Sequence, residues 1–272
     1  MVPRRAPDRV IAAAVTWLGG DEATAERVMA SPHRRPSVYV QDQRISVIAF
    51  AASDDLGPEE VHLYAGAHGL VLVCPEPLMP VLREVVGRVH GRPVEALLAV
   101  LQALADRAWA SVQELADAAD RLDQSRIGLA SGAQRRAISG LRHRLLALQQ
   151  SWMAHHLLCA PDGTLDEALD DVGSRRLRHS GATFEASAAA AAQLYALLGD
   201  TLSRQSAIIS ERLTLVTVTC LPLTVVSSFF GMNFGWMTDH IGSAAAFILL
   251  GVVLPLALVV NALVGARLLN GR

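Results

Sequence analysis

A stripe of hydroxyl side chains near the C-terminus is the pattern with the clearest chemical consequence. Its members recur at steps of three or four residues, which places them on one face of a helix: Thr214, Thr217, Leu221, Thr224 and Ser228. On a helix that faces lipid, a polar stripe is unfavourable. Around a central axis, the same stripe would line a pore with hydroxyl groups and a leucine constriction. The alternative is that each hydroxyl bonds back to a carbonyl of its own helix.

The stripe lies in the first of two long segments without charged residues, 213–230 and 241–266. A helix needs about 20 apolar residues to cross a hydrocarbon core of ~30 Å, so each segment is long enough to span a membrane. The two spans would form a hairpin with an outer loop at 231–240. The second span has no comparable stripe and is expected to face lipid. One hairpin cannot enclose a polar path, so transport requires an oligomer.

Arginine placement orients this hairpin. Arg204 and Arg212 precede the first segment, Arg267 and Arg272 follow the second, and the loop at 231–240 contains no Arg. The positive-inside rule therefore puts both termini in the cytoplasm and the loop outside. The N-terminus lacks the pattern of a signal peptide. We expect a multi-pass protein of the cell (inner) membrane.

The rest of the chain is expected to be cytoplasmic. Residues 1–91 are predicted to form an α/β domain, 92–212 a helical region with a stalk helix, and 213–272 the two-helix membrane part. Expected strands, rich in Val, Ile, Leu and Tyr and bounded by turn residues, are 37–41, 44–50, 61–65 and 70–74. Expected helices are 9–17, 23–29, 78–89, 94–122 and 134–158. A last helix is expected from 183 into the membrane. The fold class is thus α+β with a long helical stalk and two C-terminal transmembrane helices.

Composition excludes several classes of function. A net charge of −2 argues against a nucleic-acid partner. No nucleophile–base constellation, phosphate loop or spaced metal-ligand cluster is visible, so we do not expect an enzyme. The cysteines Cys74, Cys159 and Cys220 form no Cys-x-x-Cys pair, and we expect them to be buried small residues. Adjacent helical residues point about 100° apart, so His155 and His156 are expected to be an ordinary surface pair.

The triplet Gly231-Met232-Asn233 follows the first charge-free segment. A Gly-Met-Asn turn between two C-terminal membrane helices, together with Leu213-Thr214 and Pro222-Leu223-Thr224, resembles the CorA-type magnesium channels. The resemblance implies a homopentameric funnel in which the stalk helix continues into the pore-lining span. It also implies Mg²⁺ as the transported ion, with Co²⁺ or Ni²⁺ passing in some members, and no cofactor beyond Mg²⁺ as transported and regulatory ion.

The same resemblance assigns roles around the pore. Gly231, Met232 and Asn233 correspond to the selectivity filter at the outer mouth. Mg²⁺ holds its water shell tightly, so a ring of Asn233 carbonyl oxygens would accept hydrogen bonds from a hydrated ion. Leu213 and Leu221 match the hydrophobic constriction, which we interpret as a dewetting gate.

This chain departs from the family at several positions. The family's Tyr before Gly-Met-Asn is Phe230 here, and an Asn and a Met common at the cytoplasmic entrance correspond to Ala207 and Ser210. Ser210 thus joins the pore-lining set. Asp239 is the only acid in the outer loop, so cation capture there is expected to be weaker and salt-sensitive.

The family also senses cytoplasmic Mg²⁺ through carboxylates between subunits. Candidates here are Asp166, Glu167, Asp170, Asp171, Glu185 and Asp200. The alternative for each is a solvated acidic face.

Three functions remain open from the sequence. The first is a passive Mg²⁺ uptake channel, with divalent ions, lipid and its own copies as partners. The second is a zinc transporter of the ZntB-like branch, which usually lacks Met at the position of Met232. The third is a membrane-anchored scaffold or sensor without transport, against which the stripe and Asn233 argue.

Overall fold

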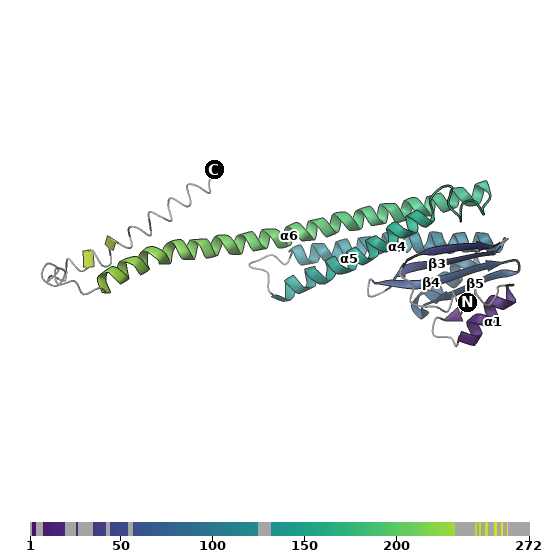
Figure 1. Ribbon diagram of the computed structural model, residues 1–272, viewed down its shortest axis with the longest axis horizontal. Coiled ribbons are helices and arrows are strands. Elements are labelled where there is room, and N and C mark those ends of the chain that lie inside the picture. Colours follow the sequence, from purple (N-terminus) through teal and green to yellow (C-terminus); the bar gives the residue numbers. More distant parts are fainter. Residues whose placement is uncertain are drawn as a thin grey trace. The chain divides into compact units, whose positions relative to one another are not determined.

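The computed structural model describes residues 2–3, 8–19, 26, 35–41, 44–53, 57–124 and 132–231, with isolated positions between 243 and 260 (Figure 1). The chain divides into two compact units, Met1–Asp200 and Thr201–Arg272. The three-part division predicted from the sequence, with boundaries at 91 and 212, stays a prediction.

The first unit contains a sheet with the strand order β1-β5-β4-β3-β2. Its strands are β1 (Val2–Pro3), β2 (Ser37–Gln41), β3 (Arg44–Ala52), β4 (Pro58–Gly66) and β5 (Gly69–Cys74). β1 is parallel to β5, and the other neighbours are antiparallel. The four predicted strands are confirmed. β1 was not predicted, because two residues carry no alternation; its Pro3 lacks an N–H and is tolerated at a sheet edge.

The described helices are α1 (Asp8–Trp17), the short η1 (Glu76–Leu78), α3 (Met79–Gly87), α4 (Pro93–Gln124), α5 (Gly132–Leu158) and α6 (Asp171–Gly231). The helices predicted at 9–17, 94–122 and 134–158 are confirmed, and the one at 78–89 corresponds to the end of η1 and α3. The helix predicted at 23–29 lies outside the described residues except for Glu26.

The long helix α6 begins well before residue 183, where the sequence predicted it to start. Gly173 and Gly181 both lie within this helix. A Cβ at Gly181 would lie 2.9 Å from the Cβ of Cys159, so the glycine permits close approach of the end of α5. This glycine therefore serves packing between helices.

Two layers of helices cover the sheet. α4 contacts β3, β4 and β5 on one face. On the other face, Val15 and Leu18 at the end of α1 form a buried cluster with Tyr64, Val71 and Val73, and Figure 1 shows α1 and α4 on opposite sides of the sheet.

The α5 and α6 helices pack with α4 in the same layer. The buried side chains of α5 recur at helical spacing: Ile138, Leu141, Leu145, Leu148, Trp152 and His155. From α6, Phe184 and Leu198 are also buried, and the Ser180 hydroxyl donates a hydrogen bond to Gln102 Oε1 of α4 at 2.8 Å. The residues of α6 up to Asp200 thus belong to the same compact unit as the sheet.

Two of the three cysteines are buried as predicted. Burial raises the pKa of Cys74 to about 11 and that of Cys159 to about 12, which keeps both thiols protonated and unreactive. The prediction was wrong for Cys220, which is exposed on α6 in this single chain.

Candidate functional site

The predicted filter follows directly on the end of α6. Gly231 is the last residue of that helix. Met232, Asn233 and Asp239 lie outside the described residues, so their roles at the outer mouth stay predictions. What the structure provides is the helix that leads to this loop.

The hydroxyl stripe lies on α6 as an uninterrupted helical face. Its members, with Ser210 and Leu213 added, are all exposed in the single chain: Ser210, Leu213, Thr214, Thr217, Leu221, Thr224 and Ser228. Leu213 and Leu221 are 62% and 63% exposed, which is high for leucine. The stripe therefore has no partner surface among the described residues of this chain.

The threonine hydroxyls of the stripe bond back to the helix. Thr214 donates to the carbonyl of Ser210 at 2.9 Å, and Thr217 to that of Leu213 at 2.9 Å. Thr224 donates to the carbonyl of Cys220 at 2.8 Å. The sequence left this arrangement open as the alternative to a pore lining, but the two are compatible. A hydroxyl that donates its hydrogen to the helix keeps its oxygen lone pairs as acceptors.

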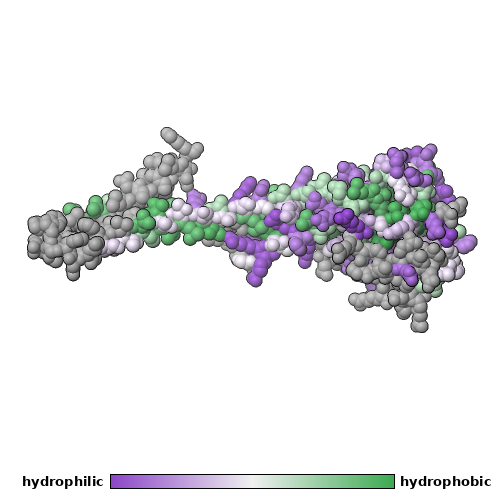
Figure 2. Space-filling model, viewed as in Figure 1, coloured by the Kyte–Doolittle hydropathy of each residue, from purple (hydrophilic) through white to green (hydrophobic). Residues whose placement is uncertain are grey.

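The surface of this part of α6 carries little charge. Figure 2 colours the described residues of α6 near Gly231 green and white, without the purple of charged side chains seen elsewhere. Among the described residues, no helix combines the length and apolarity that a membrane span requires. Most of the second predicted span, 241–266, lies outside the described residues.

Of the candidate regulatory carboxylates, Asp170 has the clearest structural role. Its Oδ1 accepts a hydrogen bond from the backbone N–H of Gly173 at 2.8 Å and caps the start of α6. Its Oδ2 accepts a hydrogen bond from Arg92 Nη2 at 2.5 Å. The bond from Gly173, followed by the bond from Arg92, lowers the pKa of Asp170, and the bond to Asp170 raises the pKa of Arg92.

The other candidate carboxylates are spread over α6 and the turn before it. Asp166 Oδ2 accepts a hydrogen bond from the N–H of Asp162 at 3.2 Å, while its Oδ1 is buried without a partner in the described part of the chain. Asp171 is the first residue of α6, and Glu185 Oε2 lies 3.9 Å from His156 Nδ1. Asp200 and Glu167 are exposed. No group of three His, Cys, Asp or Glu residues in the described ranges could hold a metal ion. The predicted site lies between subunits, so it stays a prediction.

His155 is not the surface residue that the sequence predicted. The residue is fully buried. Its ring stacks on Phe184 of α6, with centroids 4.6 Å apart, and contacts Phe50 edge-on at 6.3 Å. Its Nε2 accepts a hydrogen bond from the N–H of Phe50 at 2.9 Å, while Nδ1 lies 2.7 Å from the carbonyl of Ser151. Burial lowers the pKa of His155 to about 4, so the ring is neutral and Nδ1 carries the hydrogen.

The comparison with protein families decides the identity. The family model described as CorA-like Mg2+ transporter protein matches residues 11–264. The chain belongs to this family. The CorA-like family consists of transporters of divalent cations, and the chain is therefore assigned to that class of transporter. No curated protein matches the chain.

Solved structures share the CorA-like fold at low sequence identity. The complete CorA magnesium transporter from Methanocaldococcus jannaschii aligns with a TM-score of 0.65 and 14% identity, covering 96% of this chain and 87% of that one. The full-length CmaX protein aligns with a TM-score of 0.55 and 17% identity, covering 98% and 86%. The ZntB cytoplasmic domain from Vibrio parahaemolyticus aligns with a TM-score of 0.55 and 12% identity, covering 75% and 85%. These likenesses support an α+β domain with a long helical stalk.

The sequence did not predict two structural features of this CorA-like chain, the pairing of Arg92 with Asp170 and the burial of His155. Arg92 and Asp170 are far apart in the sequence, and no local signal joins them. The burial of His155 did have a signal. It continues the apolar stripe of α5 three residues after Trp152.

Proposed function

We propose that this CorA-like chain is a channel for passive Mg²⁺ uptake across the cell membrane, driven by the membrane potential. The observation that carries the proposal is the exposed hydroxyl stripe on α6, which ends directly before Gly231-Met232-Asn233. Cytoplasmic Mg²⁺ would gate the channel through some of the carboxylates Asp166, Asp170, Asp171, Glu185 and Asp200.

The proposed membrane part is the hairpin formed by the charge-free segments 213–230 and 241–266. Copies of the first segment would surround a central axis, and copies of the second would face lipid. Both ends of the hairpin would be held in the cytoplasm by the arginines that flank it, Arg204, Arg212, Arg267 and Arg272. Five copies are proposed because the CorA family is pentameric, and one hairpin cannot enclose a path.

The chemistry of the stripe suits a hydrated cation. Mg²⁺ releases its waters reluctantly, so it is best conducted with its shell in place. The waters of that shell present hydrogens outward and need acceptors. The hydroxyl oxygens of Thr214, Thr217 and Thr224 supply them, because each hydrogen is already donated to the helix. Leu213 and Leu221 interrupt this lining and would close the pore by dewetting.

The test is ion flux into liposomes that contain the purified full chain. Wild-type protein is expected to admit Mg²⁺, reported by an internal dye. Asn233→Ala removes the acceptor ring and is expected to lower Mg²⁺ flux or its preference over Ca²⁺ by roughly tenfold, since one lost hydrogen bond per subunit acts in concert. Asn270→Ala, at the cytoplasmic end, is the matched control and should behave as wild type. Unchanged flux in Asn233→Ala would rule out the filter assignment.

Zinc transport is the second candidate, because the fold is shared with the ZntB cytoplasmic domain. The same liposomes separate the two candidates when loaded with a zinc-sensitive dye. Zn²⁺ flux without Mg²⁺ flux would replace the leading proposal.

A further inference from the structure

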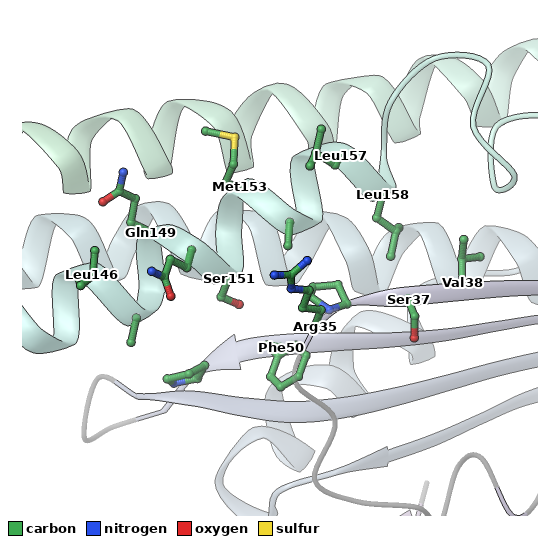
Figure 3. Close-up of a pocket in the computed structure, with 15 residues that line it drawn as sticks. Arg35, Ser37, Val38, Phe50, Leu146, Gln149, Ser151, Met153, Leu157 and Leu158 are labelled. Carbon is green, nitrogen blue, oxygen red and sulfur yellow. The ribbon is translucent and has the colours of Figure 1, made fainter.

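A groove lies between α5 and the edge of the sheet, entirely within the first unit. Its volume is about 950 Å³, at the upper end of the roughly 300–1,000 Å³ found for small-molecule sites. One wall is the C-terminal half of α5, and the other is formed by β2 with the preceding residues and by parts of β3 and β4 (Figure 3). No part of the candidate ion path lies in it.

Much of the groove is apolar. Leu146, Met153 and Leu157 of α5 lie along it, with Phe50 from the sheet. Leu157 and Met153 are 66% and 42% exposed, so this wall is uncovered in the single chain. From Leu146 to Leu157 the helix rises about 16 Å. That length suits an extended apolar chain lying parallel to the helix.

The polar residues that line the groove include Arg35, Gln149, Gln150 and Ser151. Arg35 is the only charged residue among the described residues that line the groove, and it makes no ion pair with any of them. The side-chain amides of Gln149 and Gln150 are likewise without hydrogen bonds in the described part. The Ser151 hydroxyl is buried and has no partner there, and Figure 3 shows Ser151 on the side of α5 that faces the strands. Because the Ser151 oxygen exposes almost no surface, the groups open to a ligand are Arg35 and the two glutamine amides.

We propose that this groove binds a single-chain carboxylate amphiphile, the chemical class of medium-chain fatty acids. A planar carboxylate matches the guanidinium of Arg35 in two parallel hydrogen bonds, and one lone cation favours a monoanion over a phosphate dianion. The amide of Gln150, which lies on the same face of α5 as Leu146 and Leu157, donates to the same headgroup. The alkyl chain lies on Leu146, Met153 and Leu157. This proposal is independent of which ion the protein carries.

The test uses the full chain in lipid nanodiscs with ¹³C-methyl-labelled methionine, and decanoate as the probe. The Met153 methyl signal, identified by its loss in Met153→Leu, reports on the groove. Decanoate is expected to shift this signal saturably. Decanol has the same chain without the charge. It should bind at least about tenfold more weakly than decanoate, because a charge-assisted hydrogen-bond pair is lost.

Matched variants separate the headgroup from the chain. Arg35→Gln should weaken decanoate binding about tenfold, whereas Arg83→Gln on α3 should leave it unchanged. Leu157→Glu should abolish binding, while Val81→Glu, at a similarly exposed position of α3, should not. Three results would each overturn the proposal. Decanoate and decanol could bind equally, or Arg35→Gln could bind decanoate as tightly as wild type. The third is the absence of a saturable shift, as when a neighbouring subunit covers the groove.

Discussion

His155 shows how one buried side chain joins three elements of the fold. It belongs to α5, bonds the backbone of β3 at Phe50 and stacks on Phe184 of α6. Its Nε2 must be unprotonated to accept the hydrogen of the Phe50 N–H. The contact therefore exists only for the neutral ring, and the stability of the first unit becomes linked to pH.

The acid stability of the protein should depend on His155. Its pKa is about 4 in the folded chain, against 6.5 for an ordinary histidine. Between these values the unfolded chain binds a proton that the folded chain does not, so stability falls as pH falls from 6.5 to 4. The total is on the order of 3 kcal/mol, and no further loss from this residue follows at lower pH.

The measurement is the thermal midpoint from intrinsic fluorescence, taken near neutral pH and again near pH 5. His155→Gln keeps an acceptor for Phe50 but cannot titrate, so its midpoint should change less with pH than that of wild type. His143→Gln, at an exposed position of the same helix, is the control. An unchanged pH dependence in His155→Gln would mean that other groups dominate acid unfolding.

Asp170 combines a helix cap with an ion pair, and two substitutions distinguish the roles. Asp170→Asn retains a capping oxygen but loses the charge that pairs with Arg92, whereas Asp170→Ala loses both. The thermal midpoints should therefore fall in the order wild type, Asn, Ala. Because the folded pKa of Asp170 is lowered, the advantage of wild type over Asn is present at neutral pH and disappears as pH falls through that pKa. Equal midpoints for all three would remove the cap and the pair as contributors.

Among the elements, the sheet depends on a close approach between α1 and the β4–β5 hairpin. Gly66 pairs with Gly69 across a two-residue turn. A Cβ at Gly66 would lie 2.5 Å from the carbonyl oxygen of Leu18, just after α1. The end of α1 can therefore pack on the hairpin only because residue 66 has no side chain.

Gly66→Ala should displace the end of α1 and destabilise the protein by roughly 1–3 kcal/mol, as overpacking does. Gly87→Ala is the matched control, because no atom lies within 4 Å of the added Cβ. In α3 the alanine should be neutral or slightly stabilising. Chemical denaturation of both variants measures the difference. An unchanged free energy of unfolding in Gly66→Ala would show that the end of α1 shifts without destabilising the protein.

For the whole molecule, the exposed stripe of α6 raises the question of what covers it. Leucine and threonine side chains at Leu213, Thr217 and Leu221 are exposed in one chain. Symmetric assembly would place these faces around a common axis, since identical subunits present identical surfaces. The proposed channel requires such an assembly, because one hairpin cannot enclose a path.

The purified full chain in nanodiscs should therefore show fivefold symmetry by electron microscopy, with the loop at 231–240 on the axis. Asn233→Ala should keep this symmetry, because the substitution removes an ion contact and leaves the helix packing intact. A monomer, or an axis that does not pass through this loop, would contradict the pore.

The sequence by itself determined the features that depend on local patterns. Alternating apolar runs between turn residues gave β2 to β5, and helical spacing gave α1, α4 and α5. The triplet Gly231-Met232-Asn233 behind a charge-free helix indicated the family that the comparison confirmed. These signals are periodic or contiguous, so they survive without knowledge of the tertiary structure.

Only the tertiary structure decided the contacts between residues distant in the sequence. It joined Arg92 to Asp170, placed His155 between Phe50 and Phe184, and opened the groove beside Arg35. It also placed Gly181 inside α6, where the absence of a side chain allows close packing against Cys159. Such outcomes depend on which surfaces meet in space, and the order of residues along one segment does not contain that information.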